Sequence, residues 1–212
     1  GAVDARRLLI VVSGTHGAEG FCGSGIQVGW LAANHPLPAD TAILFVHALT
    51  TYGFSHDRRV TQDNVDLNRN FIDHGNAKPA NPGYDALREF ICPKEWTEES
   101  QRRNLAALQA YASEHGFDAL ETAIASGQYV DAQGVFYGGT QPTWSNRTLR
   151  AILQPFAATA RHVAFIDLHT GLGPYGFGEI MSNHAARDPG HQSMQRWWGS
   201  EATYFDDGTS SS

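Results

Sequence analysis

The stretch that decides the fold is LLIVVS at residues 8–13, which is followed directly by the turn GTHGAE at residues 14–19. Five consecutive aliphatic residues predict a strand that is buried on both faces. His16 and Glu19 then lie where that strand ends. Because Gly17 permits a tight turn, both side chains can reach one point, and we interpret them as two ligands of a metal ion.

Two further apolar runs, at residues 42–48 and 162–168, also predict strands. Apolar residues recur at helical spacing in residues 25–34, 97–115 and 145–160. Strands that are apolar throughout and are separated by helices indicate an α/β fold with a mixed, largely parallel sheet flanked by helices. The Gly-, Pro- and Asn-rich residues 75–83 are expected to form a surface loop.

The chain has 212 residues and no low-complexity linker, so we expect a single domain over residues 1–212. It begins without a methionine, enters a strand within a few residues and stops in a polar run. We therefore expect the natural protein to continue past both ends.

The composition argues against two classes of partner. A formal net charge of -7 disfavours nucleic acid and anionic membrane surfaces, which are bound through clustered Lys and Arg. No apolar run approaches the roughly 20 residues of a membrane span, and no signal pattern opens the chain, so we expect a cytoplasmic protein.

Cys22 and Cys92 are interpreted as free thiols.

His169 ends the third predicted strand. The carboxyl ends of parallel strands meet at one edge of a sheet, so His169 is expected beside His16 and Glu19. Two histidines and one carboxylate are the protein ligands of many hydrolytic zinc sites, which leave a fourth position for water. The sequence therefore predicts one Zn²⁺ ion held by His16, Glu19 and His169.

Three segments in this order resemble the zinc carboxypeptidase family and its deacylase relatives, the aspartoacylases and succinylglutamate desuccinylases. They are the turn GTHGAE at residues 14–19, the hexapeptide DLNRNF at residues 66–71, and the strand-end His169. In that family the corresponding motifs are Gly-x-His-Gly-x-Glu, Asp-x-Asn-Arg-Asn-aromatic and a histidine after a strand. The resemblance runs from about residue 8 to residue 180 and implies a carboxypeptidase-like (phosphorylase/hydrolase-like) fold.

The resemblance also implies roles for residues around the metal. Asp66 would accept a hydrogen bond from the His16 ring nitrogen that faces away from zinc. Asn68 and Arg69 would hold a substrate carboxylate. Either Arg58 or Arg59 would steady the scissile carbonyl oxygen, and we prefer Arg59.

The general base of the family is a glutamate on a strand well after the last ligand. Here Glu179 lies too close to His169, and Glu201 has no supporting motif. We expect this glutamate to lie beyond Ser212, and the alternative is that the protein lacks it.

These expectations describe a zinc-dependent metallohydrolase that cleaves a peptide or amide bond next to a substrate carboxylate with zinc-activated water. Its partner would be a peptide or an N-acyl amino acid with a free carboxylate. Because residues 167–170 resemble the deacylase branch and residues 68–71 the peptidase branch, an N-acyl amino acid deacylase stays open. A metal-binding but inactive peptide-binding module is the second alternative.

Two other sequence features suggest functions that we do not assign to them. The run GLGPYG at residues 171–176 matches a dinucleotide-binding pattern, but Pro174 removes a backbone donor and no helix is expected to follow. We expect this loop to wall the crevice, with Tyr175 as a substrate contact. His184 and His191 are interpreted as surface residues, although either could ligate a second metal.

Overall fold

The computed structural model describes residues 1, 4–171, 173–184 and 187–204. The chain divides into two compact units, Gly1–His169 and Thr170–Ser212. Leu172 of the GLGPYG segment and residues 205–212 lie outside the described residues. Among the described residues, no helix combines the length and the hydrophobicity needed to cross a membrane.

The first unit is built on a small parallel sheet with the strand order β2-β1-β3. Its strands are β1 (Arg7–Ser13), β2 (Thr41–Val46) and β3 (His162–Leu168). Because β1 lies between the other two, Leu8, Ile10 and Val12 are buried. Val12 is in register with both Val46 and Asp167, so the three strands end at the same edge of the sheet.

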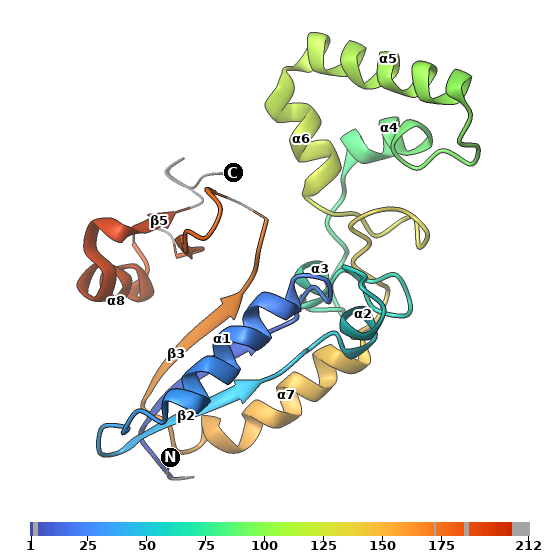
Figure 1. Ribbon diagram of the computed structural model, residues 1–212. Helices are drawn as coiled ribbons and strands as arrows, with labels where there is room; N and C mark the ends of the chain where they lie inside the picture. The colour runs from blue at the N-terminus through green and yellow to red at the C-terminus, as the bar shows by residue number, and fades with distance from the viewer. Residues whose placement is uncertain (2–3, 172, 185–186, 205–212) are drawn as a thin grey trace. The chain divides into compact units, whose positions relative to one another are not determined.

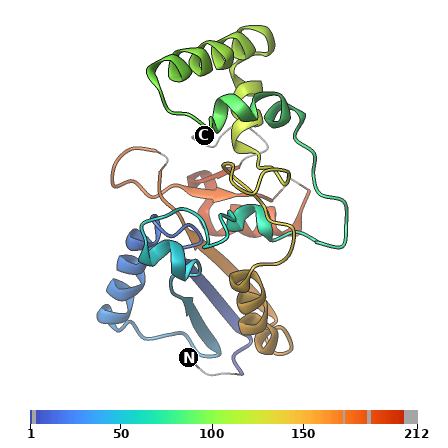
Figure 2. The same ribbon diagram turned by 90° about the vertical axis from the view of Figure 1, so that its right-hand side faces the viewer.

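Two helices, α1 (Gly20–Ala33) and α7 (Trp144–Ala157), cover opposite faces of this sheet (Figures 1 and 2). On the α7 face, Leu149 joins the buried cluster formed by alternate residues of β1. On the α1 face, Ser13 donates a hydrogen bond to the buried Gln27 side chain at 3.0 Å. Gly23 allows α1 to approach closely, since a Cβ there would lie 2.7 Å from the Cβ of Ser13. The structure is thus a mixed α/β fold in which a small parallel sheet is flanked by helices.

The other helices of this unit are α2 (Thr51–Ser55), α3 (Leu67–Asn70), α4 (Pro82–Ile91), α5 (Glu98–His115) and α6 (Phe117–Ala125). Helices α4, α5 and α6 pack on one another (Figure 1). Helix α5 begins with a capping box in which Thr97 and Ser100 each accept a hydrogen bond from the other's backbone amide. Not every apolar residue of α5 is packed, because Leu105 is 57% exposed while Asn104 is buried.

The second unit contains a parallel pair of short strands, β4 (Ile180–Ser182) and β5 (Ala202–Tyr204). Helix α8 (Pro189–Trp198) and the 3-10 helix η1 (Gly199–Glu201) connect them. The expectation of a single domain stays a prediction.

Three segments differ from the sequence-based expectations. Helix α1 begins at Gly20, five residues before the expected start. Helix α4 occupies the end of the expected loop, because Asn81 caps it by accepting a hydrogen bond from Tyr84 N and Pro82 suits the first helical position. Strand β3 is largely exposed, with Val163 at 53% and Phe165 at 50%, whereas the other edge strand, β2, has no exposed residue.

Candidate metal centre

The turn after β1 is held in place by backbone contacts to residues 58–59. The amides of Gly17 and Ala18 donate to the carbonyls of Arg59 and Arg58, at 3.3 and 3.1 Å. A Cβ on Gly17 would lie only 2.0 Å from the carbonyl carbon of Gly53, so the backbone of α2 passes where a side chain would be. Glycine is therefore required here for close approach rather than for an unusual backbone angle.

His16, Glu19 and His169 come together at the carboxyl edge of the sheet. Each offers one potential ligand atom, and these atoms all lie within 4.8 Å of one another. The Glu19 carboxylate lies between the two imidazole rings, with Oε1 2.9 Å from His16 Nδ1 and Oε2 3.1 Å from His169 Nδ1. The rings themselves are edge to face, with centroids 4.9 Å apart. This group of three side chains, which we call the ligand cluster, could hold a metal ion.

Asp66 contacts the opposite nitrogen of His16. Its Oδ1 lies 3.1 Å from His16 Nε2 and also accepts the Asn68 amide at 2.9 Å, which caps α3. Its Oδ2 accepts Arg59 Nε at 2.9 Å. Asp66 is fully buried, and although burial alone would raise its pKa, its hydrogen bond and charge interactions with His16, together with Arg59, lower the pKa to about 2.

Asp167 forms the same arrangement with the other histidine, and sequence reasoning missed it. Its Oδ2 lies 2.9 Å from His169 Nε2, and both of its oxygens accept from Thr15 Oγ1, at 2.8 and 3.0 Å. A strand alternates its faces, so residues 167 and 169 lie on the same side, and that spacing was the signal in the sequence. Each histidine of the cluster is therefore oriented by an aspartate that is itself held by a second partner.

The protonation of both histidines follows from these carboxylates. Burial lowers the pKa of His16, but the contacts with Asp66 and Glu19 outweigh it and the pKa is raised. Burial likewise lowers the pKa of His169, and Asp167 and Glu19 outweigh it to raise the pKa to about 9. Since a metal ligand must give up its proton, protons and a metal ion compete for this cluster.

The arginines expected to contact substrate differ in what they bind. Arg59 donates from Nη1 to Glu19 Oε1 at 3.2 Å, and its side chain is 41% exposed. Arg69 donates from Nη2 to the Ala125 carbonyl at 2.6 Å, while its buried Nε has no hydrogen-bond partner among the described residues. The guanidinium carbons of Arg59 and Arg69 lie 5.1 and 5.8 Å from the ring centroid of Phe136. The structure thus brings both arginines to one aromatic ring.

The remaining predicted residues are less closely tied to the cluster. Asn68 is exposed at the start of α3, and Arg58 is exposed while its carbonyl accepts from the turn. Tyr175 lies in the second unit and is fully exposed. Glu179 and Glu201 also lie in the second unit, where Glu179 accepts a hydrogen bond from Thr203 at 2.9 Å. Neither glutamate is identified as the general base.

The donor set fits a zinc ion. Two imidazole nitrogens and a carboxylate converge, and each imidazole has its other nitrogen against an aspartate, the arrangement common around bound zinc. His16 is buried and Glu19 half-buried, whereas His169 is exposed, so one side of the cluster faces solvent.

Comparison with known proteins gives a family for the chain. No curated protein and no solved structure matched it. A family described as "Protein of unknown function (DUF2817)" matches over residues 1–212. Because the match spans the whole length, the chain belongs to the DUF2817 family.

Proposed function

We propose that this protein is a carboxypeptidase-like, zinc-dependent metallohydrolase that cleaves a peptide or amide bond next to a substrate carboxylate. The observation that carries the proposal is the ligand cluster, in which His16, Glu19 and His169 converge and each histidine is backed by an aspartate. Asp66 is fully buried, where a carboxylate is costly unless it is paired, and the group it pairs with is a proposed metal ligand, His16.

Zinc bound by these residues would lower the pKa of a water molecule to about 7 and polarise a carbonyl group. The chain supplies the geometry. Asp66 and Asp167 hold the imidazoles so that both Nδ1 atoms face Glu19. Arg59, held by Asp66 and partly exposed, places a positive charge beside the cluster, where it would stabilise the negative charge developing on a carbonyl oxygen.

The expected substrate carries a free carboxylate. Arg69, with a buried Nε that lacks a hydrogen-bond partner among the described residues, and Asn68 at the start of α3 are the residues proposed to bind it. Arg58 is a further candidate contact, because it is exposed and its carbonyl accepts a hydrogen bond from the turn between β1 and α1. The expected contact of Tyr175 with substrate stays a prediction.

Two alternatives differ in substrate or in activity. The run Asp167-Leu168-His169-Thr170 resembles the deacylase branch, so the scissile bond could belong to an N-acyl amino acid rather than a peptide. An inactive, metal-binding module would bind a peptide without cleaving it. This alternative is supported by the lack of an identified general base among the described residues.

One assay separates the three functions. Zinc-loaded protein is incubated with peptides that have free C-termini and with N-acyl amino acids, and released amino groups are quantified. Hydrolysis of one set, abolished by His16→Ala and retained by His115→Ala at the exposed end of α5, supports the enzyme and identifies its branch. Binding of a peptide without release from any substrate would contradict the enzymatic function and support the inactive module.

A further inference from the structure

A cavity of about 310 Å³ lies between α7 and the face of the sheet, next to the ligand cluster. Its apolar lining includes Val12, Leu149, Leu153 and Phe165. Thr15 and Asp167 line it as well, and Asp167 also contacts His169. The cavity therefore extends from the apolar side of α7 to the partner of a proposed metal ligand.

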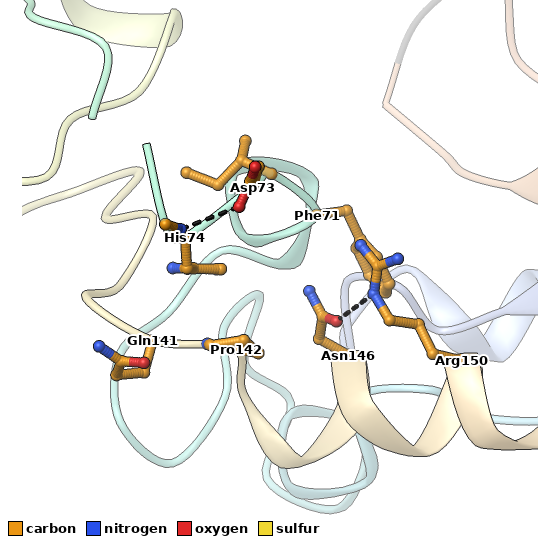
Figure 3. Close-up of a pocket in the computed structure, with 9 residues that line it drawn as sticks. Phe71, Asp73, His74, Gln141, Pro142, Asn146 and Arg150 are labelled. Atoms are coloured by element: carbon orange, nitrogen blue, oxygen red, sulfur yellow. Dashed lines mark hydrogen bonds between the residues drawn. The ribbon is translucent and has the colours of Figure 1, made fainter. Parts of the chain in front are cut away.

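The polar residues of this cavity include Asn68 and Arg150. Arg150 is exposed on α7 and donates from Nε to Asn146 Oδ1 at 2.8 Å, and its guanidinium carbon lies 5.8 Å from the ring centroid of Phe71 (Figure 3). Among the described residues, no hydrogen bond involves its two terminal nitrogens. Its orientation is thus fixed by Asn146 and Phe71, while two charged donors stay available.

Arg150 and Phe71 also line a second cavity of about 630 Å³. That cavity has mostly polar walls, among them Asp73, His74 and Gln141 (Figure 3). The pair formed by Arg150 and Phe71 therefore separates an apolar space near the ligand cluster from a polar space open to solvent. An anionic group held at Arg150 would lie at this boundary.

We propose that the 310 Å³ cavity is a binding site for an aliphatic or aromatic group, and that Arg150 binds the carboxylate attached to that group. The volume is at the small end of ligand pockets, which span about 300–1,000 Å³, and suits one side chain or short acyl chain. An arginine held by a hydrogen bond and an aromatic ring binds a carboxylate with little loss of side-chain freedom.

The role of this site in catalysis rests on the proposed function, in which Arg150 is then the alternative to Arg69 as the residue that binds the substrate carboxylate. The binding site itself does not depend on hydrolysis. It also differs from the site proposed at Arg69, whose Nη2 is already bound to the Ala125 carbonyl. The two arginines can therefore be tested against each other.

The experiment measures binding of three probes to metal-free, EDTA-treated protein by isothermal titration calorimetry or NMR. The probes are 3-phenylpropionate, its uncharged amide, and acetate. Removing the metal prevents carboxylates from binding a metal ion, so a failure to hydrolyse any substrate does not affect the result. We expect 3-phenylpropionate to bind more tightly than both the amide and acetate.

Substitutions then locate the site. Arg150→Gln should weaken 3-phenylpropionate binding roughly 10- to 100-fold and leave amide binding unchanged, since a hydrogen-bonded charge is lost. Arg147→Gln, on the same helix but lining neither cavity, is the matched control and should bind like wild type. Leu153→Phe, which fills the apolar wall, should weaken 3-phenylpropionate and leave acetate unchanged.

Three outcomes would overturn the proposal. The acid and the amide could bind equally to the wild-type protein, or none of the probes could bind. Arg69→Gln, rather than Arg150→Gln, could remove the preference for the acid, which would assign the carboxylate to Arg69. Circular dichroism of each variant shows that a loss of binding does not reflect loss of folding.

Discussion

At the scale of single residues, the two aspartates that back the histidines explain the charge distribution of the ligand cluster. Asp66 and Asp167 differ in burial, yet each places an oxygen about 3 Å from a histidine Nε2. This leaves Nδ1 of both rings facing Glu19. Orientation by carboxylates fixes which nitrogen can bind a metal and makes the ring a better electron donor.

Replacing either aspartate by asparagine should therefore weaken zinc binding about 10- to 100-fold. Asparagine keeps the shape and, at position 66, the capping oxygen of α3. The affinity is measured by competition with a chromogenic chelator. Asp63→Asn, an exposed aspartate outside the cluster, is the control, and affinities equal to that control would contradict a role for Asp66 and Asp167 in metal binding.

The pKa of His169 predicts the pH dependence of the metal-free protein. Because its pKa is about 9 in the fold against 6.5 as the ordinary value, protonation of His169 stabilises the metal-free fold. This contribution is fully present below about pH 6.5 and is lost as the pH rises through 9. Chemical denaturation of EDTA-treated protein should show a falling free energy of unfolding across this window, and a zinc-saturated sample should lack the fall. Parallel curves for the two samples would contradict it.

At the scale of secondary-structure elements, the turn between β1 and α1 must keep its glycine. Gly17→Ala places a Cβ against the backbone of Gly53, so we expect a loss of at least about 1 kcal/mol of stability together with weaker zinc binding. Gly25→Ala, within α1 and with open space around its Cβ, is the matched control. It should stabilise the protein by about 0.5–1 kcal/mol. Equal effects of the two substitutions, measured by urea denaturation, would be inconsistent with the close approach at Gly17.

The longer elements could be predicted from the sequence because their signals are local. The three strands of the sheet are apolar runs, and α5 carries its own start and stop signals at Thr97 and Gly116. The four-residue α3 and the three-residue β4 and β5 are too short for periodicity to detect. The exposure of β3 could not be foreseen, since an edge strand and a central strand can have the same apolar sequence.

The residues of the candidate site were predictable to different degrees. His16, Glu19 and His169 were found because strand ends meet at one edge of a sheet, and Asp66 was found through the resemblance of its motif. Asp167 and Arg150 were missed, because their roles depend on which side chains face them after folding. The contact of Arg69 with the Ala125 carbonyl could not be predicted either, because it joins residues that are 56 positions apart in the sequence.

At the scale of the whole molecule, a metal ion would link β1, β3 and the turn between β1 and α1. The ligand cluster and its partners bring Glu19, Asp66 and Asp167 close together, and Arg59 donates hydrogen bonds to Glu19 and Asp66. A divalent cation would reduce the repulsion among these carboxylates. Binding should therefore stabilise the fold as well as supply chemistry.

Zinc at a free concentration 100 times its dissociation constant should add about 2.7 kcal/mol to the free energy of unfolding. For a chain of this length that corresponds to a rise in Tm of roughly 5–11 °C. Differential scanning fluorimetry with zinc, with EDTA and with both tests the shift and its reversal. His169→Ala should show no rise, and a rise of equal size in this variant would place the zinc elsewhere.

Metal analysis of the purified protein by inductively coupled plasma mass spectrometry tests whether His16, Glu19 and His169 hold one zinc ion. We expect one zinc per chain in the wild-type protein and in the exposed-histidine control His115→Ala. We expect close to none in His16→Ala and in His169→Ala. Wild-type protein without stoichiometric zinc after incubation with the ion, or an unchanged zinc content in both ligand variants, would contradict it.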